Sequence, residues 1–195
     1  MFGFASIFFA SALGTEPFQG NGAPETHSQN EQLQMQMSAE DVRGQVVAFV
    51  STIDTAISRT TWEALGSRAE PVLRELIANA DNFPTHRAKA IYGLAVVGGT
   101  AAASLFREVT MAETEPLVVR LAAVRGLEQV LDPQALRSEL QPLLVGAKDS
   151  RVRAYAGEVL IRRGGREACA AVQIQAGTER PEKVGLYKRL LAQCE

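Results

Sequence analysis

Apolar residues recur at helical spacing from about residue 38 to the C-terminus, and no segment shows the apolar-polar alternation of a strand. The sequence Ser38-Ala39-Glu40-Asp41 has the S-x-x-D form of a helix N-terminal capping box. The apolar residues that follow it at helical spacing predict the apolar face of a first helix over about 38–59: Val42, Val46, Phe49, Val50, Ile53 and Ile57. Turn residues separate the later apolar runs. The chain is therefore predicted to be all-α, with further helices near 70–80, 87–97, 101–112, 120–131, 134–145, 153–163, 167–177 and 181–195.

One type of helix recurs at a constant interval. Arg87, Arg120 and Arg153 lie 33 residues apart, and they open the strings RAKAIYGLAVVGG, RLAAVRGLEQVLD and RAYAGEVLIRRGG. A constant period of this length is typical of stacked helical repeats, in which each unit is a pair of helices. In this register, small residues share one column (Ala90, Ala123, Ala156) and leucines share another (Leu94, Leu127, Leu160), so both columns are expected in the core.

These repeats resemble the HEAT-repeat family, in particular its short bacterial, phycobilisome-lyase-like members. The resemblance implies a right-handed α-solenoid of stacked antiparallel helix pairs over about 60–195, with the 38–59 helix as an irregular N-terminal cap. The expected repeat domain is thus 38–195. The motifs that carry the resemblance are DSRVR at 149–153, the looser 115–120, the A-x-x-x-L pattern after each Arg, and the phrases EPVLREL at 70–76 and ALRSEL at 135–140.

The resemblance also gives a role to the repeated arginines. In HEAT-like arrays such an Arg bonds to an acidic residue or a carbonyl of the neighbouring repeat, so Arg87, Arg120 and Arg153 are expected to form a structural ladder. The copy at 83–87 lacks an acidic residue at the family's spacing before Arg87, and a break in the ladder is expected there. A phosphate or carboxylate ligand shared by the three arginines is the alternative.

The first 14 residues are nearly all apolar or small, and Ala10-Ser11-Ala12 has the A-x-A form preferred by signal peptidase. Residues 1–12 are predicted to be a signal peptide, although no Lys or Arg precedes the apolar run. An uncleaved anchor and a short buried or interfacial helix are alternatives. Residues 13–37 are rich in Gln, Asn, Gly, Pro and Glu, which predicts a disordered tether. The expected location is periplasmic or secreted, with no stable membrane span after processing, or cytoplasmic if residues 1–12 are no signal peptide.

The sequence holds two cysteines, Cys169 and Cys194. They lie at similar distances from the turn between the last two predicted helices, so in an antiparallel pair they would be neighbours. An oxidising compartment would permit a disulfide between them. Two small buried apolar residues are the other interpretation.

Composition argues against several functions. The formal net charge of −2 disfavours nucleic acid, whose phosphates require clustered Lys and Arg. Only two histidines occur, His27 in the tether and His86 beside Arg87, and neither a metal site nor a Ser/His/Asp triad can be assembled from them. No phosphate-binding or dinucleotide-binding glycine motif follows a strand. No catalytic, cofactor-binding or metal-binding residue is therefore predicted.

The favoured function is a non-enzymatic scaffold or adaptor that binds another protein on a concave face lined by the second helices of the pairs. The alternative is a small enzyme or chaperone-like, lyase-like factor that holds a ligand in a deep pocket of that face. Four aromatic residues are either core or surface anchors: Trp62, Phe83, Tyr92 and Phe106. A basic group at Arg151, Arg153, Arg162, Arg163 and Arg166 is either a solvated surface or a site for an acidic partner. The partner-binding candidates are Arg74, Glu75, Arg107, Glu108, Arg137, Glu139 and Gln141.

Overall fold

The computed structural model describes residues 37–53 and 55–194. Every regular element in those ranges is helical, which confirms the all-α prediction. The predicted signal peptide and residues 13–36 of the predicted tether lie outside them. The elements are α2 (Ala39–Ser51), α3 (Arg59–Leu65), the 3-10 helix η1 (Gly66–Ala69), α4 (Glu70–Ala78), α5 (Pro84–Val97), the 3-10 helix η2 (Gly99–Ala102), α6 (Ala103–Met111), α7 (Leu117–Val130), α8 (Pro133–Gly146), α9 (Ser150–Thr178) and α10 (Val184–Leu191).

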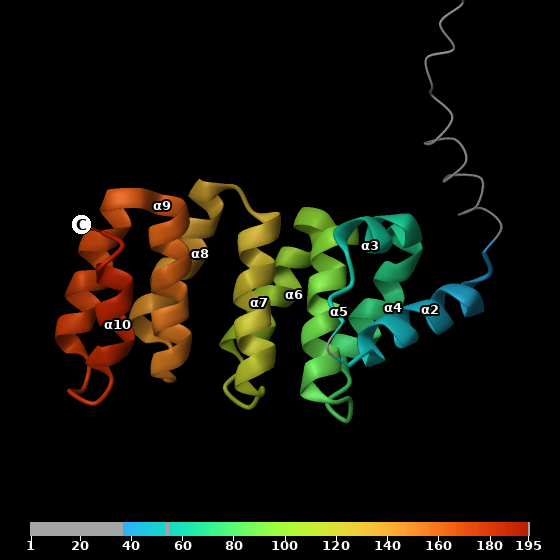
Figure 1. Cartoon of the computed structure of the whole chain (residues 1–195), viewed down its shortest axis with the longest axis horizontal. Coiled ribbons are helices and arrows are strands. Elements are labelled where there is room, and N and C mark those ends of the chain that lie inside the picture. Colours follow the sequence, from blue (N-terminus) through green and yellow to red (C-terminus); the bar gives the residue numbers. More distant parts are fainter. Residues whose placement is uncertain (1–36, 54, 195) are drawn as a thin grey trace, which may run out of the picture.

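The helices form two layers in a single elongated row (Figure 1). The first-helix layer consists of α5, α7 and residues 150–164 of α9, which stand side by side with α5 packed on α7 and α7 on α9. The second-helix layer consists of α4, α6, α8 and residues 166–178 of α9. Each second helix packs against the first helix that follows it, α4 on α5, α6 on α7 and α8 on α9. This is the expected array of stacked helix pairs, and α10 adds a last helix against α9.

The element α9 contains two helices joined at a sharp bend. Gly165 has φ 61° and ψ −146° inside it, a conformation that favours glycine because it has no Cβ. The bend turns residues 166–178 back alongside residues 150–164, as the paired glycines at 164 and 165 predicted. The predicted pair of helices is thus present, although only the bend at Gly165, and no longer loop, separates the two helices.

The first helix is shorter than predicted. Its capping box is confirmed, since the Ser38 hydroxyl accepts from the Asp41 amide and the Asp41 carboxylate accepts from the Ser38 amide. However, the helix ends at Ser51, and Ile53, predicted to lie on its apolar face, is 84% exposed. At this end Thr52 leaves the helical conformation, with φ −59° and ψ 143°; its hydroxyl donates to the Phe49 carbonyl over 2.8 Å, and Lys89 Nζ donates to its carbonyl. The prediction of a helix to residue 59 was therefore wrong.

The repeat columns form the core. All three alanines of the first column and all three leucines of the second are buried: Ala90, Ala123, Ala156, Leu94, Leu127 and Leu160. Two of the four aromatic residues belong to this core. The Trp62 ring packs edge-on against Phe49, with ring centroids 5.4 Å apart, and Phe106 is fully buried against Gly126 of α7. The core interpretation therefore holds for Trp62 and Phe106.

Candidate partner-binding groove

The repeated arginines tie each first helix to the end of the preceding second helix. Arg87 Nε donates to the carbonyl of Ile77 over 2.8 Å, and Arg120 Nε donates to the carbonyl of Thr110 over 2.9 Å. Both guanidinium groups are buried. Each bond joins two residues that are ten positions apart in the sequence, so the two bonds are equivalent contacts of successive repeats.

Two of the three repeated arginines, Arg87 and Arg153, also bind a carboxylate that comes later in the chain. Arg87 Nη2 donates to Glu115 Oε1 over 2.7 Å, so the break expected at this copy is absent. The acidic residue comes 28 positions after Arg87 instead of shortly before it. Arg153 donates to both carboxylate oxygens of Glu179. Because protein groups occupy these donors, the arginines serve to join repeats, and we assign them no shared ligand.

The Glu179 carboxylate is the centre of a buried network at the C-terminal end. Besides Arg153, the Tyr187 hydroxyl donates to it over 2.9 Å and the Gln175 amide donates over 3.3 Å. The hydrogen bonds from Arg153 lower the pKa of Glu179 to about 2, against the opposing effect of burial. Burial and the contact with Glu179 raise the pKa of Tyr187. One carboxylate thus links both halves of α9 to α10.

Most partner-binding candidates lie on the second-helix layer, where they pair with each other or with neighbouring repeats. Arg107 Nε donates to Glu139 over 2.7 Å, and Arg137 donates to Glu167 over 2.6 Å. The hydrogen bonds from Arg107 lower the pKa of Glu139. These ion pairs join α6 to α8 and α8 to α9. The charges on this layer therefore neutralise one another between repeats.

The remaining candidates show the same tendency. Glu75 accepts from both terminal nitrogens of Arg43 of α2, and its pKa is lowered by these bonds. Arg74 binds Glu70 of its own helix and also donates to the Ala101 carbonyl over 3.1 Å. The two other candidates, Glu108 and Gln141, are exposed. The layer has few free charges to offer a partner.

A hollow of about 650 Å³ lies on the opposite layer. We expected the second helices to line such a surface, but the hollow is formed by α5, α7 and α9 with α3 and residues 55–57. It forms because small side chains, including Ala88 and Ala122, face outward there between larger aromatic residues. Its lining consists of Thr55, Ala56, Ile57, Trp62, Ala88, Lys89, Tyr92, Val118, Leu121, Ala122, Arg125, Gly126, Gln129 and Tyr155.

The lining is mainly apolar, and its charged groups are all cations. None of the lining residues is Asp or Glu. Lys89 extends along the wall and donates to the carbonyl and the hydroxyl of Thr52. Arg125 is exposed and forms no ion pair with any residue of the described ranges. Tyr92 is 37% exposed and supplies an aromatic wall.

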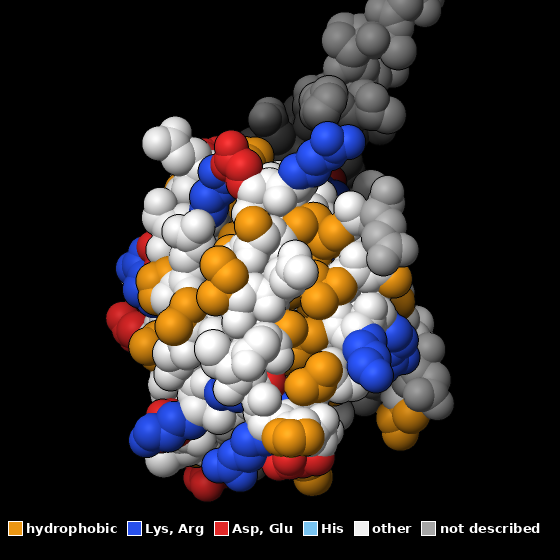
Figure 2. Space-filling view, turned by 90° about the vertical axis from the view of Figure 1, so that its left-hand side faces the viewer, with side chains coloured by type: hydrophobic (Ala, Val, Ile, Leu, Met, Phe, Trp, Pro, Cys, Tyr) orange, Lys and Arg blue, Asp and Glu red, His pale blue; other side chains and the backbone are white. Residues whose placement is uncertain are grey.

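A second hollow of about 390 Å³ continues the first toward the C-terminal end. Leu121 and Tyr155 line both hollows, and α10 contributes Leu186 and Arg189 to the second. We call the two hollows together the first-helix groove. The second hollow reaches α10 at the end of the row, and apolar side chains lie open on that end face, with both basic and acidic side chains around them (Figure 2).

The repeat period contained a signal for this groove that the sequence analysis did not use. Lys89, Ala122 and Tyr155 are 33 residues apart, so they occupy equivalent positions of three first helices. Tyr92 and Arg125 are related in the same way. Of the four aromatic residues considered as anchors, Tyr92 is the exposed one in the groove. Phe83, also exposed, precedes α5 and packs against His86, with ring centroids 5.3 Å apart.

The basic group on α9 is mixed in character. Arg151 pairs with Asp149, and its hydrogen bond lowers the pKa of that carboxyl to about 2. Arg162 pairs with Glu128 of α7 and Glu158 of its own helix. Most of this group therefore serves contacts within the protein.

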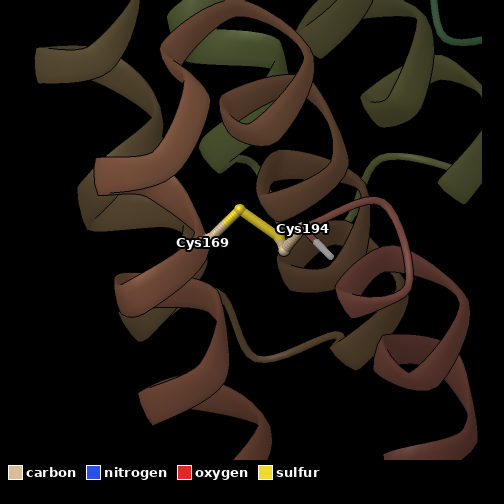
Figure 3. Close-up of a disulfide and its surroundings, with 2 residues drawn as sticks. All are labelled: Cys169 and Cys194. Atoms are coloured by element: carbon tan, nitrogen blue, oxygen red, sulfur yellow. A yellow bond between two sulfur atoms is a disulfide. The ribbon is translucent and has the colours of Figure 1, made fainter.

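The two cysteines form a disulfide (Figure 3). Cys169 lies in the second half of α9 and Cys194 follows α10, with Cα atoms 6.0 Å apart. Of the two interpretations that the sequence left open, the structure contains the bonded one. The bond anchors the C-terminal end of the chain to the helix array.

The described part of the chain contains no cluster of His, Cys, Asp and Glu side chains suited to holding a metal ion. None of its helices combines the length and the apolar character needed to cross a bilayer.

Comparison with known proteins gives a fold relative. No protein-family model matches the chain, and no curated protein matches it. Among solved structures, it is similar to a chain in the complex of CpcE and CpcF of phycocyanin lyase from Nostoc sp. PCC7120. The similarity has a TM-score of 0.56 at 20% sequence identity, and it covers 81% of this chain and 100% of the other. This likeness bears on the fold, and it confirms that the chain has a HEAT-like helical-repeat architecture.

Proposed function

We propose that the protein is a non-enzymatic scaffold that binds another protein in the first-helix groove. The observation that carries the proposal is the contrast between the two layers. The second-helix layer pairs Arg107 and Arg137 with carboxylates of neighbouring repeats, whereas the first hollow of the groove presents an apolar surface with two cations, Lys89 and Arg125, that lack carboxylate partners in the described ranges. A protein surface that combines apolar area with unpaired charge is suited to a partner.

The fold relative supports a role in protein assembly. That structure is a complex of two proteins, CpcE and CpcF. Rigid repeat arrays generally offer extended binding surfaces of the kind seen here. For this protein we propose only that the fold provides a binding surface, and we propose no catalytic reaction from the similarity.

We propose further that the protein acts in the periplasm or outside the cell. The apolar residues before Ala10-Ser11-Ala12 support export, and the disulfide supports an oxidising compartment. The intact mass of the protein from its native host, measured without reductant, tests this. A mass lacking residues 1–12 and the two thiol hydrogens is expected. A full-length mass with free thiols would place the protein in the cytoplasm.

A small apolar ligand is the second candidate for the groove. The volume of the first hollow lies within the range of ligand sites, and the buried Trp62 Nε1 in its wall has no hydrogen-bond partner among the residues that the structure describes. Such a ligand would make the protein the chaperone-like or lyase-like factor considered from the sequence. Co-purification of a chromophore or lipid with the native protein would favour this alternative.

Site-specific photo-cross-linking in the native host tests the scaffold proposal. A photoreactive amino acid replaces Val118, an exposed residue of the groove, or Val145, an exposed apolar residue of α8 in the second-helix layer. We expect a discrete protein adduct from position 118, reduced by Tyr92→Ala, and none from position 145. Equal adducts from both positions, or none from position 118, would refute the proposal.

A further inference from the structure

We infer that the partner segment held by the first-helix groove is acidic and amphipathic, with apolar side chains against the floor and carboxylates at the rim. This inference rests on the proposed function and adds the chemistry of the partner. It is carried by three cations placed around one apolar surface: Lys89, Arg125 and Arg189.

These three cations differ from most others in the protein. Arg87, Arg107 and Arg137 bind carboxylates of neighbouring repeats, Arg153 binds Glu179, and Arg74 binds Glu70 of its own helix. By contrast, none of the three groove cations has a carboxylate within ion-pair distance in the described ranges. Within the described ranges, no carboxylate pairs with the positive charge of these three side chains.

The nearby carboxylates are already engaged. Glu158, which lines the second hollow, binds Arg162, and Glu128 on α7 binds the same arginine. Glu158 thus lines the second hollow as an ion-paired carboxylate, whereas the first hollow, which Arg125 lines, has no Asp or Glu in its lining. A carboxylate of a partner would therefore meet Arg125 without an acidic residue in the lining around it.

The apolar floor decides which anionic partner fits. Val118, Leu121 and Tyr92 offer apolar contact area, and an apolar wall lowers the local dielectric constant and strengthens a charge pair at its edge. A phosphate backbone would leave this floor without complementary contact. A second copy of the chain would bring the same cations together across the interface. A segment with both apolar and acidic side chains satisfies the floor and the rim at once.

Fluorescence anisotropy with designed peptides tests the inference on the full mature chain with its disulfide intact. The acidic probe is a labelled helical peptide of about 18 residues, with Leu at helical spacing on one face and Glu on the flanks. The basic probe replaces every Glu by Lys. The scrambled probe keeps the acidic composition without the apolar face. We expect the acidic probe to bind about tenfold or more tightly than either other probe, with an affinity that falls as salt rises.

Two charge reversals locate the binding. Arg125→Glu is expected to weaken the acidic probe by about tenfold or more, because an attraction becomes a repulsion. Arg163→Glu is the matched control, since Arg163 is an exposed arginine of α9 outside both hollows, and a change below about twofold is expected. Circular dichroism checks that both variants fold, and Arg125→Gln gives a milder test if the reversal disturbs α7.

Several outcomes would overturn the inference. Equal binding of the acidic and basic probes would mean that apolar contact alone drives binding. Tighter binding of an oligonucleotide of similar length would indicate a nucleic-acid site. Concentration-dependent dimerisation abolished by Arg125→Glu would make a second copy the occupant. If Val118 cross-links a partner while no probe binds, the inference fails and the proposed function stands. If position 118 gives no adduct and no probe binds, both fail.

Discussion

The carboxylate of Glu179 provides a quantitative test of how the C-terminal helices are held. Its side chain is only 2% exposed and accepts hydrogen bonds from Arg153, Tyr187 and Gln175. We predict that Glu179→Gln lowers the free energy of unfolding. The substitution preserves the shape of the side chain while it removes the charge that these donors bind.

The pKa of Glu179 gives the magnitude. It falls from 4.5 to about 2 in the folded protein. Since one pKa unit corresponds to about 1.4 kcal/mol, the folded state is stabilised by roughly 3 kcal/mol when the group is ionised. The folded pKa lies below the unfolded one, so this contribution is complete above about pH 4.5 and is lost as the pH falls toward 2.

Urea unfolding followed by circular dichroism, at several pH values between 7 and 2, measures the effect. The variant is expected to be about 3 kcal/mol less stable than the native protein at pH 7 and to approach it near pH 2. Glu167→Gln is the control, because Glu167 is a largely exposed carboxylate paired with Arg137, and such pairs contribute about 1 kcal/mol or less. A stability difference for Glu179→Gln that stays constant with pH would refute the assignment to the charge.

Two further predictions concern the disulfide and the helix packing. Replacing both Cys169 and Cys194 by Ser removes a cross-link between residues 25 positions apart and should lower the unfolding free energy by about 3.5 kcal/mol in urea titrations. The native protein with its disulfide reduced should be as unstable as this variant, which is the check. Gly126→Ala should destabilise by about 1–2 kcal/mol in thermal melts, because the new Cβ would lie 2.8 Å from the Phe106 ring. Gly44→Ala, in open space on α2, should leave the stability unchanged or raise it. A Gly44→Ala variant less stable than the Gly126→Ala variant would contradict this packing.

Part of the structure could be predicted because it depends on contacts that are local in sequence. The capping box at Ser38 needs only the residue three positions on, and the bend at Gly165 needs only a residue that tolerates positive φ. The end of the first helix at Ser51 was missed for the opposite reason. Lys89, 37 residues away, holds the carbonyl of Thr52 and helps to direct the chain toward α5.

The candidate site depended even more on distant contacts. Arg107 and Arg137 were expected to face a partner, yet each meets a carboxylate about 30 residues away in the next repeat. The repeat period predicts that positions such as Arg107 and Glu139 are neighbours in a stack. It does not reveal which neighbouring side chains carry opposite charges close enough to pair, since that depends on the stagger between helices.

An all-α array of helix pairs could be predicted from the amino-acid sequence, because a 33-residue period of alanines and leucines at helical spacing allows few other ways to bury its apolar faces. Tertiary structure alone decided that α5, α7 and α9, and not the second helices, border the groove. Periodicity fixes which side of each helix is buried. Only the packing of helices that are distant in sequence decides where small side chains leave space and which charges remain without a partner in the fold.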